Sequence, residues 1–254
     1  YQGDAKLEVN SVYQSGFSTY NPGTLDMNGK SLLLKHDLTL SGLKGGGTIY
    51  VSGNVTLTLD GVSSTGTSII VYKGGKLKLD NTTAFTVEKG ASLMAQTTFY
   101  KSGDGNKENS DPKDQTFLGI SLTNNGNILT TNELHAKTIT LGANSKTQVG
   151  SNVTADEKLT AAGKLSAQII TAKDASVTGT VVASKLFSLA NSLTVNGAEA
   201  KVYGNYIKAG QYDDSKEKAA TFIRQENGSN IYVGNNGQIN NYTKYNTNRK
   251  SSKQ

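Results

Sequence analysis

The most constraining feature of this sequence is a strict alternation of apolar and polar residues in very short pieces. It is clearest in residues 55–59, 76–79 and 137–141, where Val, Leu and Ile alternate with Thr and Lys. Alternation with a period of two places the apolar residues on one face of an extended strand, and β-branched residues favour that conformation. Each piece ends in turn residues, such as Asp60-Gly61 and Asp80-Asn81. The sequence therefore predicts an all-β protein of many short strands.

The spacing of the apolar positions favours a stack of similar turns. Successive positions are eight or twelve residues apart, and the series comprises Leu57, Ile69, Leu77, Phe85 and Leu93. Farther along, the positions expected to face inward are Leu165, Ile169, Val177, Val181 and Leu186. A turn glycine precedes the apolar residues repeatedly, as in 53–57, 75–79 and 163–166. Units that bury their apolar face on the neighbouring units explain this repetition. We predict a parallel β-solenoid, with a β-sandwich as the alternative.

The pattern divides the chain into three regions. Residues 1–27 are irregular, and we expect them to form an N-terminal cap. Residues 28–210 carry the repeat, interrupted by residues 101–115, which contain no apolar side chain and are expected to form an exposed loop. Residues 211–254 end the repeat. There, acidic residues at the start of 213–224 and a glycine beyond its end predict a short helix, followed by a polar, basic tail.

Composition narrows the classes of function. The chain has no Cys, which excludes disulfides, thiolate metal sites and a cysteine nucleophile. No run approaches 18 apolar residues, so we expect no transmembrane segment, and no secretory hydrophobic segment opens the chain. The net charge is +6, but Arg occurs only at Arg224 and Arg249. Because nucleic-acid readers rely on Arg and the lysines here are scattered along strand-like pieces, we predict no nucleic-acid partner.

The residue patterns of catalysis are not found in the sequence. There is no G-x-S-x-G motif, and the acidic residues are dispersed. Asp156 and Glu157 are adjacent, so on one strand their side chains would point to opposite faces. We therefore expect no catalytic residue and no cofactor. The charged loop 101–115 offers the one candidate Ca²⁺ site, although it does not have the ordered spacing of a calcium-binding loop.

Two groups of residues are candidates for contact with a partner. The first group consists of tyrosines, whose amphipathic rings suit stacking on a sugar or a protein. It comprises Tyr50, Tyr72, Tyr100, Tyr203 and Tyr206, with Tyr212 and Tyr232 as further members. The alternative is that these rings only cover turns and strand ends. The second group lies in the charged loop and comprises Lys101, Asp104, Lys107, Glu108, Asp111 and Lys113.

Threonine pairs of the form T-x-T occur at 56/58, 138/140 and 178/180. A flat threonine face requires such pairs at one fixed position of every turn. Because the pairs are 82 and 40 residues apart, most turns have none, and the sequence does not predict a threonine face of the kind that binds ice.

Several strings resemble the passenger domains of autotransporters, the type V secreted proteins of Gram-negative bacteria. They are "GGTIYVSGNVTLTLDG", "YKGGKLKLDNTTAFTVEKGASL" and "LTNNGNILTTNELHAKTITLGANSKTQV". The resemblance covers about residues 28–208 and implies a right-handed parallel β-helix. The string "DASVTGTVVASKLFSLANSLTVNGAEAKVYGNYI" is also similar to bactofilins, and the repeats resemble those of filamentous haemagglutinin-like exoproteins.

The resemblance implies a non-enzymatic stalk or adhesin on the surface of a Gram-negative bacterium, acting in cell adhesion or autoaggregation. The expected partners are a glycan or protein on host or bacterial cells, or a second copy bound side by side or end to end. The alternative is a self-assembling scaffold or filament, bactofilin-like or surface-layer-like. A β-helical carbohydrate-active enzyme is the third hypothesis.

Overall fold

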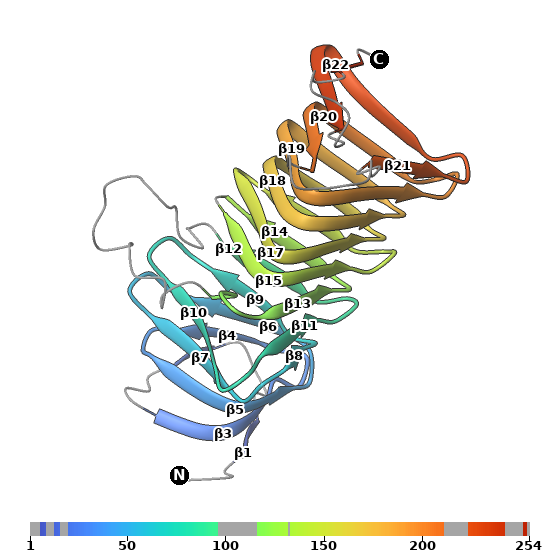
Figure 1. The fold of residues 1–254 in the computed structure, drawn as a ribbon. Helices are drawn as coiled ribbons and strands as arrows, with labels where there is room; N and C mark the ends of the chain where they lie inside the picture. Colours follow the sequence, from blue (N-terminus) through green and yellow to red (C-terminus); the bar gives the residue numbers. More distant parts are fainter. Residues whose placement is uncertain are drawn as a thin grey trace.

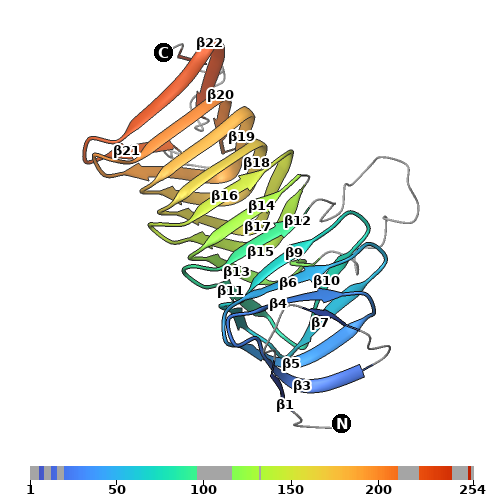
Figure 2. The ribbon, with the colours of Figure 1, turned by 180° about the vertical axis from the view of Figure 1, so that it is seen from behind.

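The chain folds into a right-handed parallel β-helix of about 9 turns. The computed structural model describes residues 6–8, 13–15, 20–95, 116–131, 133–210, 223–241 and 251–252. Within these residues there are strands and turns and no helix. Every strand pair is parallel except the short pair of β22 with β23. Figure 1 shows the strands stacked in one column between the two ends of the chain, and Figure 2 shows the same column from behind. The predicted solenoid is therefore confirmed, and the sandwich alternative is wrong.

Each turn contains up to three strand segments, and segments at the same position of successive turns form one face. The first face begins with β2 (Tyr13–Ser15), β4 (Ser31–Leu34), β6 (Thr48–Val51), β9 (Ser68–Val71), β12 (Ser92–Ala95), β14 (Asn127–Thr130) and β16 (Lys146–Val149). It continues through the opening segments of β18 (Lys164–Val177), β19 (Thr180–Asn196), β20 (Lys201–Ala209) and β22 (Asn230–Asn241).

The other two faces follow the first in each turn. The second face contains β1 (Lys6–Glu8), β3 (Tyr20–Asp26), β5 (Leu38–Lys44), β7 (Thr56–Asp60) and β10 (Lys76–Asp80), and later the first part of β15 (Leu134–Leu141) and of β17 (Asn152–Ala161). The third face contains β8 (Ser64–Thr65), β11 (Ala84–Val87), β13 (Ser121–Asn124) and β21 (Ile223–Glu226), with the ends of β15, β17, β18 and β19. The short β23 (Ser251–Ser252) pairs with the end of β22.

The core is a set of inward ladders, mostly of apolar side chains, that run the length of the helix. On the first face the pairing register places one inward residue of each turn above the last, and this ladder comprises Leu32, Ile49, Ile69, Leu93, Ile128, Thr147, Leu165, Val181, Val202 and Ile231. All of these side chains are buried. Because each strand buries only one of its two sides, the core is thin, and a chain with 35% hydrophobic residues can fill it.

The spacing seen in the sequence corresponds to steps from face to face. Leu77, Phe85 and Leu93 are eight residues apart, all buried, and lie on the second, third and first faces in turn. The shortest turn takes 16 residues, from Lys164 to its pairing partner Thr180.

Two expected inward positions are wrong. Ile169 and Leu186 are half-exposed, and the neighbouring Ile170 and Phe187 are buried instead. The pairing register shifts between Ala167 and Ile169 and between Ala183 and Leu186, at the corner from the first to the second face. Such a bulge inserts an extra residue, which reverses the alternation beyond it.

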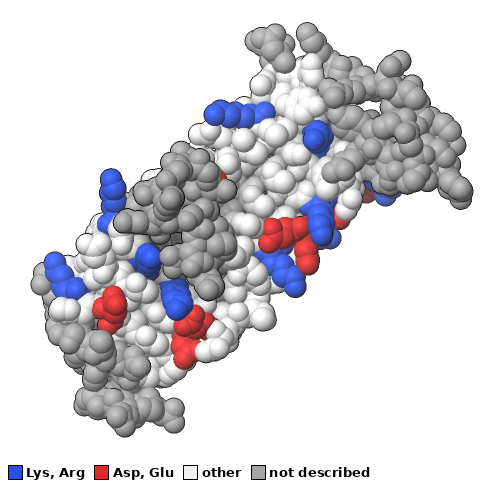
Figure 3. Space-filling model, turned by 60° about the vertical axis from the view of Figure 1, so that its left-hand side comes forward, with Lys and Arg blue, Asp and Glu red and all other residues white. Residues whose placement is uncertain are grey.

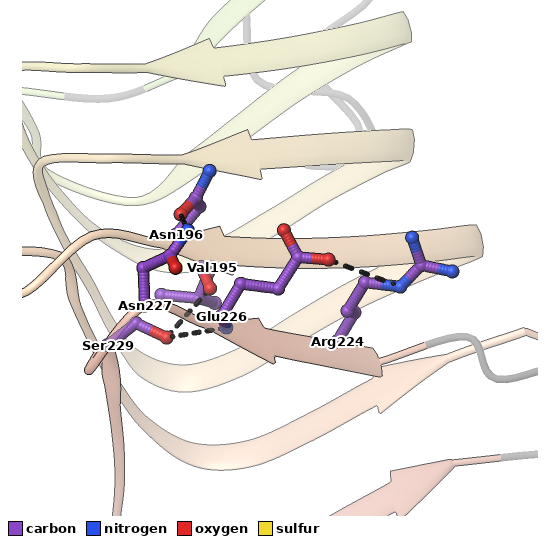
Figure 4. A network of polar contacts seen from close by, with 6 residues as sticks. All are labelled: Val195, Asn196, Arg224, Glu226, Asn227 and Ser229. Carbon is purple, nitrogen blue, oxygen red and sulfur yellow. Dashed lines mark hydrogen bonds and ion pairs between the residues drawn. The ribbon is translucent and has the colours of Figure 1, made fainter.

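A polar clamp joins the last turns at the corner between the third and first faces (Figure 4). The hydroxyl of Ser229 donates to the carbonyl of Val195 at 2.7 Å and accepts from the amide of Glu226 at 3.2 Å. The amide of Asn227 donates to Asn196 at 2.7 Å. Asn227 has a positive φ of 51°, a conformation that Asn tolerates, so the tight turn between β21 and β22 is explained by its residue type.

The irregular ends of the chain are described only in part. Within 1–27, β1 and β3 pair with each other, β3 pairs with β5, and β2 pairs with β4. Of the expected helix 213–224, residues 213–222 lie outside the described residues, and Ile223 and Arg224 belong to strand β21 instead, because Ile223 extends the inward ladder above Leu193.

Candidate functional site

A row of outward side chains on the first face forms the most distinctive surface of the molecule. These residues pair in register from turn to turn, and we call them the outer ladder: Leu33, Tyr50, Ile70, Met94, Leu129, Gln148, Ser166, Val182, Tyr203 and Tyr232. Eight of the ten are apolar or aromatic, although they point away from the core. Leu129, Tyr203 and Tyr232 are among the most exposed large hydrophobic residues of the described chain, at 38%, 37% and 43%. An apolar row kept outward over successive turns is typical of a contact surface.

Tyrosines stack in pairs at two places on this face. Tyr50 lies on the outer ladder, and its ring stacks on that of Tyr72, which follows β9, with centroids 6.1 Å apart. Tyr203 and Tyr232 occupy the same position of consecutive turns, and their rings stack at 4.7 Å and 12°. The spacing between the second pair matches the distance between neighbouring strands, so the stack is a direct product of the strand register.

The second tyrosine pair borders an open trough of about 370 Å³. Three stacked tripeptides line it, one from each of β19, β20 and β22, and we call it the tyrosine trough: Val182, Ala183, Ser184, Tyr203, Gly204, Asn205, Tyr232, Val233 and Gly234. In each tripeptide the first and third residues point outward and the middle one faces the core side, so the trough runs between the outer ladder and the corner of the helix.

The remaining candidate residues divide into two sets. Tyr206 lies on β20 beyond the corner, half-buried and paired in register with Leu186 and Gln238, so it is not brought into the trough lining. The loop candidates and one tyrosine lie outside the described residues, and so does the candidate Ca²⁺ site; they are Tyr100, Lys101, Asp104, Lys107, Glu108, Asp111 and Lys113.

A hydroxyl ladder on the third face was missed by the reasoning from T-x-T pairs. The pairing register aligns Ser64, Thr86, Thr123, Thr140, Thr160, Ser176 and Thr194 in one outward column. The column flanking it is mixed, comprising Ala84, Ser121, Thr138, Lys158, Asp174 and Ser192. The single hydroxyls align because turns of unequal length stack in register, which no fixed sequence spacing reveals.

Charged side chains on the described surface are mixed in sign. Figure 3 shows acidic side chains lying beside lysines on the visible face. On the second face His135 lies 2.6 Å from Asp156, and at its corner with the third face Lys137 lies 3.9 Å from Glu157. These groups are half-exposed or exposed, so such pairs contribute little to stability.

Two features are absent from the described residues. No group of three or more His, Cys, Asp and Glu side chains could hold a metal ion. No helix there is long and apolar enough to cross a membrane.

Tyr203 and Tyr232 were predicted from the sequence as contact residues, but the other residues that line the trough were not. Ser184, Asn205 and Gly234 carry no sequence signal, because their role depends on the corner that brings three separate strands together. Leu129 was not among the predicted contact residues, and the structure places it outward on the outer ladder.

Comparisons with protein-family models, with curated proteins and with solved structures found nothing that matches this chain.

Proposed function

We propose that this chain is a rigid segment of a bacterial surface protein that holds an adhesive face away from the cell. The observation that carries the proposal is the outer ladder, in which eight of ten stacked outward side chains on one face of a regular rod are apolar or aromatic. Tyrosine is enriched where proteins meet their partners, and the ladder ends in two exposed, stacked tyrosines.

The geometry of the rod supports display. About 9 turns, each advancing about 4.8 Å, carry the far end of the helix roughly 40 Å from the first turn. Because each turn is hydrogen-bonded to the next along its strands, the rod keeps its length without a second domain. The resemblance to autotransporter passengers, which rests on the sequence strings, supports a location on the surface of a Gram-negative bacterium.

The test of display is antibody labelling of intact and of permeabilised producing cells, with protease treatment of the intact cells. We expect intact cells to be labelled and the protease to remove the label. An internal protein of the same cells is the control, since it must be labelled only after permeabilisation.

Labelling that appears only after permeabilisation would contradict the proposal. The self-assembling scaffold would then be the better hypothesis, and electron microscopy of the purified chain would look for filaments.

A further inference from the structure

We propose that the tyrosine trough binds a neutral glycan, holding one or two sugar residues against the Tyr203 and Tyr232 rings. This inference rests on the proposed adhesive function and names the ligand class of one site on the adhesive face. It is carried by four features of the trough: its charge, its aromatic wall, its polar groups and its size.

The lining of the trough is uncharged. None of its nine residues is Lys, Arg, His, Asp or Glu. A sulfated, phosphorylated or sialylated ligand would therefore lose its hydration here without gaining a charged partner from the lining, which costs binding free energy. A neutral ligand avoids that cost.

The aromatic wall suits a sugar ring. Tyr203 and Tyr232 are 37% and 43% exposed, and their near-parallel rings stack on each other, so that each ring keeps its edge and one face uncovered by the other. A pyranose presents apolar C–H groups on its faces and hydroxyls around its rim. A tyrosine offers the matching combination of an apolar ring and a phenolic hydroxyl that donates and accepts.

The corner side of the trough provides polar groups. Ser184 and Asn205 are exposed there, and within the described part of the chain neither side chain makes a hydrogen bond. The amide of Asn205 can donate and accept at once, and so can the hydroxyl of Ser184. Vicinal sugar hydroxyls need this pairing of donors and acceptors.

The volume of the trough limits the number of sugar residues that it can hold. A volume of about 370 Å³ is near the lower end for small-molecule sites, which suits one or two sugar residues of a longer chain.

The trough stays open at Gly234, where an added Cβ would meet only the Asn205 Oδ1, at 3.4 Å. A larger side chain at this position would therefore enter the trough without a clash with the backbone.

The experiment measures binding of the purified full chain to immobilised oligosaccharides. The neutral probes are gluco-, galacto- and manno-oligosaccharides, and the acidic probes are heparin fragments and sialyllactose. We expect binding to at least one neutral series and at least tenfold weaker binding to the acidic probes. The double variant Tyr203→Ala/Tyr232→Ala should weaken neutral binding at least tenfold, and so should Gly234→Leu, which keeps both rings.

The matched control is Tyr206→Ala, which removes a half-buried tyrosine of β20 that lies beyond the corner and does not line the trough. It should bind within twofold of the parent. Unfolding midpoints in urea verify that all three variants are folded. The inference is overturned if no neutral oligosaccharide binds, if acidic probes bind better, or if binding survives both trough variants.

The result separates this inference from the proposed function. Surface labelling of intact cells without glycan binding in the trough overturns the inference and leaves display standing. Glycan binding by a chain that is labelled only in permeabilised cells overturns display and leaves the inference standing.

Discussion

At the scale of single residues, one buried polar cluster shows how the solenoid tolerates non-apolar side chains in its core. Asn124 is fully buried at an inward position of β13. Its amide donates to the Thr147 hydroxyl at 2.9 Å and to the carbonyl of Lys146 at 3.1 Å, and its oxygen accepts from the amide of Gly126 at 3.0 Å. Because every polar atom of the amide has a partner, the cluster ties two successive turns together at low cost.

Replacing Asn124 with Ala should destabilise the protein. The change leaves the amide of Gly126 and the hydroxyl of Thr147 without their partner in the core, and unsatisfied buried groups cost about 1–3 kcal/mol each. We expect a loss of about 2–3 kcal/mol in the free energy of unfolding, measured by urea denaturation. The control Thr123→Ala, on the outward side of the same strand, should lie within about 0.5 kcal/mol of the parent. Equal stabilities would show that the cluster contributes nothing.

At the scale of elements, the corners decide how closely successive turns stack. Where the third face meets the first, Gly163 and Gly179 lie one above the other, and neither has a positive φ. A Cβ at Gly179 would collide with the carbonyl oxygens of Ala162 and Gly163 in the turn below. Glycine is therefore required here by backbone-on-backbone packing and not by the dihedral angle.

The variant Gly179→Ala should cost about 1–3 kcal/mol, because the turn must shift to make room for a methyl group. The measurement is again the urea unfolding curve. Gly234→Ala is the matched control, since its added Cβ meets only a side-chain atom at 3.4 Å, and it should leave the midpoint close to the parent. If the two variants were equally stable, close stacking at this corner would not be limiting.

Some features of the strands could be predicted from the sequence, and others could not. The alternation in 55–59 and the eight-residue steps from Leu77 to Leu93 predicted strands and their buried side, because both depend on local periodicity. The sides of Ile169 and Leu186 were not predictable, since a bulge reverses the alternation without a sequence marker. The stack of Tyr203 on Tyr232 depends on the pairing of residues 29 positions apart, so only the strand register reveals it.

At the scale of the whole molecule, the first and third faces differ in chemistry although they share one core. The first face carries the apolar outer ladder, whereas the third carries the hydroxyl ladder. An apolar row is costly to leave in water and is relieved when a partner covers it, and hydroxyls are already well solvated. We therefore propose that the first face is the adhesive one and that the third face stays in water.

The most direct test of that proposal compares two variants of the full chain, one with a lysine placed on the first face and one with a lysine placed on the third. Leu129→Lys changes the outer ladder, and Thr140→Lys changes an exposed member of the hydroxyl ladder on the third face of the same turn. Beads are coated with the parent chain or with one variant. After washing, we count the beads retained on cultured epithelial cells and, in a separate assay, the beads that aggregate with one another. We expect at least a tenfold loss of retained or aggregated beads for Leu129→Lys and parental values for Thr140→Lys. Equal retention by both variants, or a loss confined to Thr140→Lys, would contradict it.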